Sequence, residues 1–312
     1  MTHRNIYMTD ELQAIYDQTV EFVQREVTPH GEQWELDGKI PREVHKKMGE
    51  LGMFGLRVPV EHGGLGLGML ASATFSEALG ASTFGGFDVS VLVHTENMTI
   101  VAARTSTENR YGITMFLVPA GTEGFSVAKK LDKHGWRCSD TAELVFDNVW
   151  VADDQVLGTV DRGFYETMRN FQNERMVLVG MGVGAAQVAL DQTLEHVQHR
   201  PAFGGHLWDL GAIRQRLAMR QAELDAVRAS MYHAAWIGDV GEDNVKEMSG
   251  VKAYGAEVIN NIMYDCVQFH GGMGYMRETP VERMSRDARI LPIGGGATEV
   301  MLEEVAKRSV IA

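Results

Sequence analysis

Apolar residues recur every three or four positions over long stretches of the chain, which is the period of an amphipathic helix. In residues 9–28, Leu12 and Val20 lie on one apolar face, Thr9 can cap the first turn, and Pro29 ends the pattern. The same period predicts further helices at 41–56, 69–80, 162–199, 209–237, 244–269 and 297–310. Short polar loops between the last four indicate an antiparallel bundle.

The pattern changes between residues 98 and 151. Four short runs, "MTIVAART", "ITMFLVPA", "FSVAKKL" and "AELVFDNVWV", are rich in strand-forming residues and are separated by turn residues. Four strands make a thin sheet that needs a partner to cover it. We therefore predict a mainly α protein with a small β domain: an N-terminal helical domain at 1–95, a middle β domain at 96–158 and a C-terminal four-helix bundle at 159–312.

Composition excludes several classes of protein. The net charge of −13 argues against binding to nucleic acid, so any anionic ligand must be met by local arginines or helix N-termini. Cys138 and Cys266 are the only cysteines, which argues against a disulfide framework or a thiolate metal cluster. The opening "MTHRNIYMTDELQ" is too polar for a signal peptide, and no apolar run reaches membrane-spanning length. We expect a cytoplasmic protein without a membrane span.

Two glycine-rich segments invite a nucleotide-binding interpretation. Gly180, Gly182 and Ala185 satisfy G-x-G-x-x-A, but an unbroken helical period from 176 to 197 and the lack of a second strand with a ribose-binding acid favour a helix. Glycines inside a helix then indicate close approach of another backbone or a ligand. The run Gly294–Gly296 lacks the Lys-Ser/Thr of a P-loop. It is either a flexible turn or an anion site at a helix start.

A third candidate is a metal site. Glu195, His196 and His199 stand at helical spacing, but no fourth ligand is evident, so a solvated helix face is favoured and no metal is predicted. The chain also lacks a G-x-S-x-G nucleophile elbow.

Four segments together resemble the acyl-CoA dehydrogenase family. They are "LGMFGLRVPVEHGGLGL", the β-rich 113–158, "GFYETMRNFQNERMVLVGMGVGAAQVALDQTLEHVQHRPAFGG" and "VQFHGGMGYMRETPVERMSRDARILPIGGGATEVM". The resemblance spans nearly the whole chain in the expected order of helices, strands and helices. It implies an FAD enzyme that removes an α-proton and a β-hydride from an acyl-CoA thioester. Such chemistry needs a carboxylate of raised pKa as base.

The position of that base differs from the common family pattern. Many members read "YEGTSEI" where this chain reads "GGGATEV", and the glutamate that serves as their base is replaced here by Gly295. In a branch that includes isovaleryl- and long-chain-type enzymes, the base instead precedes an arginine at the start of the long helix. Glu174 and Arg175 occupy that position. The resemblance therefore implies Glu174 as catalytic base and Arg175 as a substrate-binding residue; from the residues alone, Glu174 is a plain first-turn acid.

The same matching implies a set of FAD-binding residues. Those that resemble family contacts to the cofactor are Arg200, Phe203, Gln268, Gly271, Gly272, Ala297 and Glu299, where Ala297 replaces the usual threonine. Because Arg200 and Phe203 resemble residues that reach the FAD of a neighbouring subunit, a homodimer or homotetramer is implied. The implied partners are an acyl-CoA substrate and an electron-transferring flavoprotein.

One departure weakens the analogy. Between "FDVSVLVHT" and "ENMTIVAART" the family normally has on the order of seventy more residues, enough for several strands of about six residues each. The flavin-ring and acyl-binding stretches "TEP-x-x-GSD" and "W/F-I-T" belong to that part and do not occur in this chain. The remaining sheet should then expose an edge and an apolar face. A catalytically impaired or half-site subunit, assembled with a full-length relative in a hetero-oligomer, is the alternative expectation.

Overall fold

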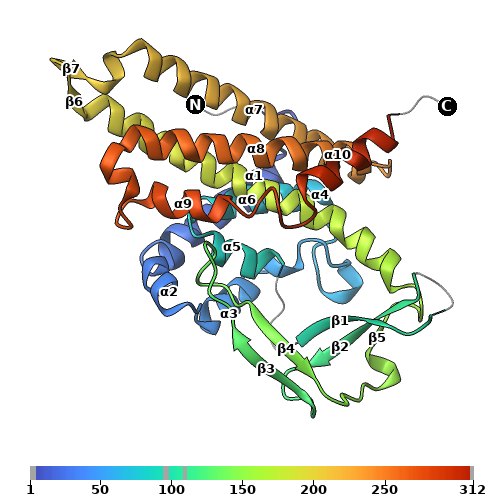
Figure 1. Ribbon diagram of the computed structural model, residues 1–312. Coiled ribbons are helices and arrows are strands. Elements are labelled where there is room, and N and C mark those ends of the chain that lie inside the picture. Colours follow the sequence, from blue (N-terminus) through green and yellow to red (C-terminus); the bar gives the residue numbers. More distant parts are fainter. Residues whose placement is uncertain (1–4, 94–97, 108–110, 310–312) are drawn as a thin grey trace.

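The computed structural model describes residues 5–93, 98–107 and 111–309 (Figure 1). The predicted junction at His94–Asn97 lies outside the described residues. The N-terminal part consists of short helices whose apolar faces close around a core that includes Phe22, Trp34 and Phe87. Its helices are α1 (Asp10–Phe22), α2 (Gly31–Asp37), α3 (Arg42–Glu50), α4 (Met69–Gly80) and α5 (Gly85–Leu92), and a π-helical turn, Val23–Val27, extends α1.

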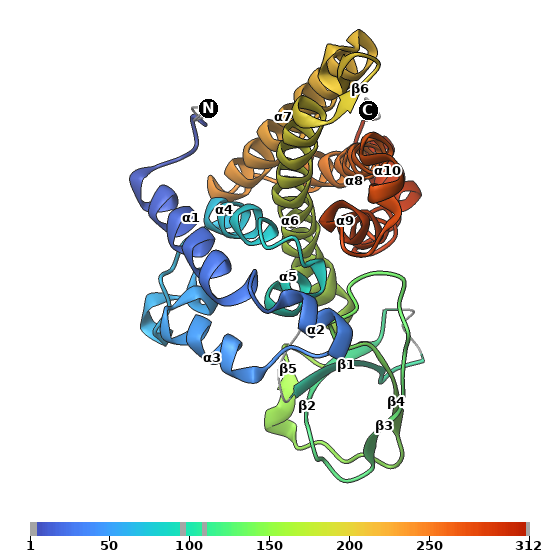
Figure 2. The ribbon, with the colours of Figure 1, turned by 90° about the vertical axis from the view of Figure 1, so that its left-hand side faces the viewer.

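The strands form two small sheets instead of the single sheet expected from the sequence. In the first, β1 (Met98–Arg104) pairs antiparallel with β2 (Ile113–Pro119), which also pairs with the short β5 (Val156–Leu157). In the second, β3 (Phe125–Lys130) pairs with β4 (Ala142–Phe146). Figure 2 shows the two sheets lying opposite one another below the helices.

Both sheets leave apolar side chains uncovered, as the predicted lack of further strands requires. Among the strands of the described residues, β1 is an edge strand, and β3 and β4 pair only with each other. Val127, Leu144 and Phe146 on the second sheet are exposed, and Trp150 beyond it is 78% exposed. Unpaired edges beside apolar side chains favour association with another chain.

The C-terminal part is a bundle of long helices. Its elements are α6 (Gly163–His199), the hairpin β6 (Pro201–Ala202) and β7 (Gly205–His206), α7 (Gly211–Asp239), α8 (Val245–His270), α9 (Pro280–Ala288) and α10 (Thr298–Lys307). Its core includes Met176, Met231 and Ile259, which are all buried. Figure 1 shows α6, α7 and α8 side by side, with β6 and β7 at one end of the bundle and α10 towards the other. The helix α9 was not anticipated.

The glycines of α6 serve helix packing, which excludes the dinucleotide-binding interpretation. Gly180, Gly182 and Ala185 all lie inside α6, and residues 176–179, where the motif needs a strand, are helical as well. A Cβ on Gly184 would stand 2.0 Å from the Glu77 carbonyl oxygen, and a Cβ on Gly80 would stand 2.1 Å from the Met181 carbonyl oxygen. The backbones of α4 and α6 therefore touch, as the mid-helix glycines predicted.

The sequence led us to expect no segment long and apolar enough to span a membrane, and α6 is an exception by length and composition. Within the described residues it is the one helix that is long and apolar enough to cross a membrane, with a mean hydropathy of 1.3 over its most apolar window. However, 67% of that window is buried inside the protein. A central helix of a helical bundle has this composition because neighbouring helices surround it.

Candidate active site and cofactor-binding residues

Glu174 lies in the fourth turn of α6 and is half-buried. Asn170, one turn earlier, donates a hydrogen bond from Nδ2 to Glu174 Oε1 over 2.6 Å. Burial raises the pKa of the Glu174 carboxyl above its ordinary value, and the neighbouring Arg175 partly offsets this rise. A carboxylate with a raised pKa is a better proton acceptor than an exposed one.

Arg175 connects Glu174 to the glycine run far along the chain. Its side chain is buried, and its Nε donates a hydrogen bond to the Gly295 carbonyl oxygen over 3.3 Å. The two alternative positions for the base, Glu174 and Gly295, are thus joined through one side chain. The residue that follows Glu174 therefore contacts the position at which many relatives carry their base.

The backbone conformation at position 295 explains why a glycine occupies it. Its φ of +67° lies in the left-handed region that favours glycine. A Cβ there would stand 2.6 Å from Cδ1 of Leu178, which lies one turn after Glu174 on α6. Leu178 therefore occupies the space that a side chain at position 295 would need.

Lys252 on α8 completes this corner of the bundle. It is 1% exposed, and its Nζ donates a hydrogen bond to the Gly296 carbonyl oxygen. Burial, followed by the positive charge of Arg175, lowers the pKa of Lys252 to about 8. Two cationic side chains thus hold two consecutive carbonyl groups of the glycine run.

A hollow of about 410 Å³ adjoins the Glu174 region. Its lining residues are Arg57, Met69, Glu166, Arg169, Asn170, Gln172 and Asn173. Asn170 both lines this hollow and contacts the Glu174 carboxylate. Glu174 itself does not line this hollow, and Asn170 is the residue that links the two.

The predicted cofactor-binding residues fall into two separate groups. Arg200, Gly271 and Gly272 line one hollow of about 360 Å³ where α6 and α8 end. Gln268 lies in the last turn of α8 beside it, and Phe203, 90% exposed with φ +51°, lies between β6 and β7. A Cβ on Gly271 or Gly272 would meet no atom within 4 Å, so this surface is open to a ligand.

The second group lies at the start of α10. Ala297 is the N-cap residue of α10, and Glu299 is an exposed residue in its first turn. The preceding Gly296 contacts Lys252. Gly271, the C-cap of α8, lies 19 positions after Lys252, a distance of about 28 Å at 1.5 Å per helical residue. One chain therefore does not bring all of its predicted cofactor contacts to a single place.

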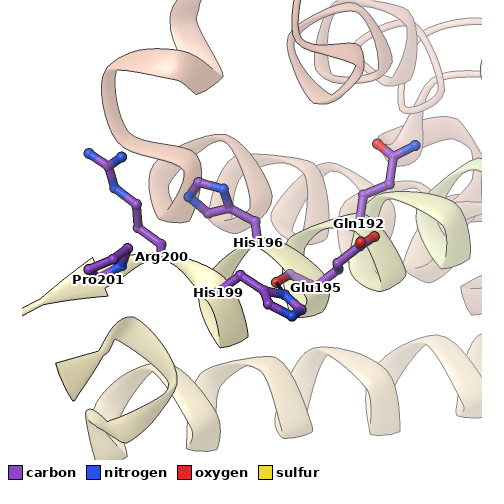
Figure 3. A pocket seen from close by; sticks show the side chains of 6 residues that line it. All are labelled: Gln192, Glu195, His196, His199, Arg200 and Pro201. Atoms are coloured by element: carbon purple, nitrogen blue, oxygen red, sulfur yellow. Dashed lines mark hydrogen bonds between the residues drawn. The ribbon is translucent and has the colours of Figure 1, made fainter.

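The metal candidates do not converge. Glu195, His196 and His199 line another hollow together with Arg200, and Figure 3 shows His196 and His199 pointing to different sides of α6. Within residues 5–93, 98–107 and 111–309, no group of three or more metal-ligating side chains is placed to hold an ion.

Several residues of these sites were not singled out from the sequence. Leu178 and Lys252 reach the glycine run because α6 and α8 pack there, and no local motif marks them. His270 stacks on His196 with 4.4 Å between ring centroids. The only signal for this contact is that each histidine lies in the last turn of its helix.

Comparisons with known proteins define the class. The models of the N-terminal, middle and C-terminal domains of acyl-CoA dehydrogenases match residues 9–110, 89–149 and 161–310. An acyl-CoA dehydrogenase structure from Geobacillus kaustophilus superposes with a TM-score of 0.91 at 25% identity, covering 98% of this chain and 99% of that chain. These matches define an FAD-dependent oxidoreductase of the flavoprotein type.

The chain belongs to the acyl-CoA dehydrogenase family. Among curated relatives, the isovaleryl-CoA dehydrogenase of Solanum tuberosum is 30% identical, covering 93% of this chain and 89% of the relative. The long-chain specific acyl-CoA dehydrogenase of Mus musculus is 28% identical, covering 93% of this chain and 84% of the relative. The fold class and the family expected from the sequence are confirmed, and FAD is the cofactor of this family.

The chain is shorter than these relatives. The alignment with the Solanum enzyme spans 365 residues, 53 more than the 312 residues of the whole chain, so the relative has at least that many positions without a counterpart. The middle-domain match covers only residues 89–149. This chain therefore lacks residues that its relatives have, as expected. That the missing residues belong between residues 95 and 96 stays a prediction.

Proposed function

We propose that this protein is an acyl-CoA dehydrogenase in which Glu174 removes the α-proton of an acyl-CoA thioester. The observation that carries the proposal is the link from Glu174 through Arg175 to Gly295, a glycine where many relatives have their base. A half-buried carboxylate with a raised pKa suits the role. Asn170 holds the Glu174 carboxylate in place through its amide, and Arg175 is the residue that we assign to substrate binding.

The residues at the bundle end fit FAD. Arg200 carries a positive charge, and no hydrogen-bond partner for its guanidinium occurs in the described part of the chain, while the open surface at Gly271 and Gly272 admits an anionic group. When bound, FAD would supply the acceptor for the β-hydride. Because the other predicted contacts, Ala297 and Glu299, lie at the start of α10, we propose that two chains share each cofactor in a homodimer or homotetramer. An electron-transferring flavoprotein would then reoxidise the flavin.

The test of Glu174 is a kinetic one. Purified protein should be yellow and should reduce an artificial acceptor in the presence of an acyl-CoA. Glu174→Gln should lower turnover by about 10²–10⁴-fold, the range typical of a lost general base, while the flavin absorbance is retained. Asp191→Asn, an exposed acid on the same helix, is the matched control and should leave turnover unchanged. Normal turnover in Glu174→Gln would remove this residue from the role.

A second candidate function is a half-site subunit that assembles with a full-length relative. The exposed apolar residues of the second sheet and the shortfall of at least 53 positions favour it. Expression alone and together with a full-length acyl-CoA dehydrogenase separates the two proposals. Flavin absorbance and turnover of the protein alone support the enzyme, whereas flavin retained only after co-expression supports the half-site subunit.

A further inference from the structure

The glycine run Gly294–Gly296 leads into α10, and only its flanks are fixed by the backbone around it. The first glycine donates its N–H to the Ile290 carbonyl oxygen over 2.8 Å, and Thr298 beyond the run donates to the Pro292 carbonyl oxygen over 3.0 Å. The second and third glycines have φ values of +67° and +110°. Glycine has the largest backbone freedom of any residue. The middle of the run therefore keeps one conformation only if other groups fix it.

Two buried cations fix the middle of the run. Lys252 Nζ donates to the Gly296 carbonyl oxygen, and Arg175 Nε donates to the Gly295 carbonyl oxygen. The two residues are 1% and 6% exposed, respectively. Within the described residues, neither cation forms an ion pair with a carboxylate. The run is thus tied to α8 by one side chain and by the other to α6, at the residue next to Glu174.

Packing alone does not explain a lysine at position 252. An ammonium taken out of water loses its hydration, and one carbonyl group replaces little of it, so the burial of Lys252 opposes folding. A methionine has a side chain of similar length and would fill the same space without a charge. The hydrogen bond to Gly296 is the contact that an ammonium makes here and a methionine cannot make. Its effect on the glycine run is therefore the place to look for a function.

The charges around Lys252 make its proton easier to lose. Burial, followed by the positive charge of Arg175, lowers the pKa of Lys252 to about 8, and Glu257 on α8 works in the opposite direction. From α10, Glu304 and Arg308 act on Arg175 in turn. Among the described residues, no charged group of α7 or α9 shifts the pKa of Lys252. Because a charged donor makes a hydrogen bond roughly twice as strong as a neutral one, the tie to the glycine run weakens as the pH rises through this range.

We propose that Lys252 is a positioning residue for the dehydrogenation: its ammonium fixes the glycine run, and the run fixes Arg175 beside the Glu174 carboxylate. The inference rests on the proposed function, because it takes Glu174 as the base. Lys252 acts through two hydrogen bonds to consecutive carbonyl groups. Loss of the first bond frees the run, and the guanidinium next to the base then loses its fixed partner. A misplacement of about 1 Å lowers a catalytic rate by on the order of 10²-fold.

Lys252→Met tests the role through opposite effects on turnover and stability. We expect kcat to fall by about 10–100-fold with little change in KM. The midpoint of thermal unfolding should be no lower than that of the wild type, because a buried charge is removed. Lys246→Met, an exposed lysine on the same helix, is the matched control and should change neither. A lower midpoint with an unchanged kcat per folded molecule would reduce Lys252 to a structural tie and overturn the proposal.

The pH profile and a conservative variant test the part played by the charge. In the wild type, kcat should fall above about pH 8 as Lys252 loses its proton. Lys252→Arg keeps a positive charge throughout this range. It should therefore restore most of the turnover that Lys252→Met loses, and its kcat should not fall above about pH 8. A fall at high pH that persists unchanged in Lys252→Met would assign it to another group and overturn the role of the ammonium.

Hydrogen exchange measured by mass spectrometry separates this inference from the assignment of the base, because it needs no turnover. At about pH 7, the amides of residues 294–298 should exchange faster in Lys252→Met than in the wild type. The difference should shrink by about pH 9, where most of the Lys252 protons are lost. Equal exchange in the two proteins would overturn the role of Lys252, even if the wild type has no turnover. Faster exchange together with normal turnover in Glu174→Gln would instead disprove the assignment of the base and leave the tie to the glycine run intact.

Discussion

The Nε of Arg175 donates a hydrogen bond to the carbonyl oxygen of Gly295 across 3.3 Å. This contact joins the fourth turn of α6 to the loop that precedes α10, 120 residues later. It places the glycine that lacks a carboxylate next to a helix turn that carries one.

Replacing Arg175 should alter the pH dependence of catalysis. The guanidinium lowers the pKa of Glu174, so its removal in Arg175→Met should raise that pKa further. The base must be ionised to act, so the rise of kcat/KM with pH should move to higher pH. Arg175→Lys keeps the charge but not the Nε hydrogen bond, and its pH profile should stay close to that of the wild type. A profile in Arg175→Met that does not move would refute the electrostatic role.

Gly295→Ala should destabilise the protein by about 1–3 kcal/mol, because an alanine must adopt the left-handed conformation there and its Cβ meets Leu178. Gly241→Ala is the matched control, since Gly241 has φ +85° but open space around its Cβ position. Chemical denaturation should show the larger loss for Gly295→Ala. Equal losses would mean that the Leu178 contact relaxes without cost.

The contact between α4 and α6 predicts a contrast between two glycines in helices. Gly184→Ala places a methyl group against the Glu77 carbonyl oxygen, and a backbone atom cannot move aside as a side chain can. We expect a loss of about 1–3 kcal/mol from this overpacking. Gly250→Ala on α8 meets only Val305, at 3.8 Å, and should stabilise the protein by about 0.4–1 kcal/mol. Thermal unfolding of the two variants measures the difference.

Ionisation of Asp287 should lower the free energy of unfolding as the pH rises. Burial, and next the charge of Glu35, raise the pKa of Asp287 to about 7 although two backbone amides donate to it. Its unfolded value is near 4, so its contribution to stability is complete below about pH 4 and is lost as the pH rises towards 7. Asp287→Asn should flatten this slope. Denaturation at several pH values measures it, with Asp153→Asn, an exposed acid, as control.

The bundle helices could be predicted because their apolar period is long. The expected helix at 244–269 corresponds to α8, Val245–His270. The short helices α2, α5 and α9 were missed, because about two turns give few repeats of the apolar period. The division of the strands into two sheets also could not be predicted, because pairing depends on contacts between distant segments.

The site was predictable only in part. The family pattern pointed to both Glu174 and Gly295, but their connection through Arg175 depends on how α10 packs, which no local pattern encodes. For the same reason Leu178, which fills the space at Gly295, could not be recognised from its surroundings in sequence. The stacked pair His196 and His270 was visible only as single polar residues near two helix ends.

The separation of Lys252 and Gly271 along α8 has a genetic consequence if two chains share each cofactor. If each flavin spans two copies of the chain, one copy damaged at Arg200 and another damaged at Glu174 would each be inactive in a pure assembly. Mixed assemblies would gather both lesions into one pocket and leave the other pocket whole. Two defective alleles could therefore restore part of the activity when they are expressed in the same cell.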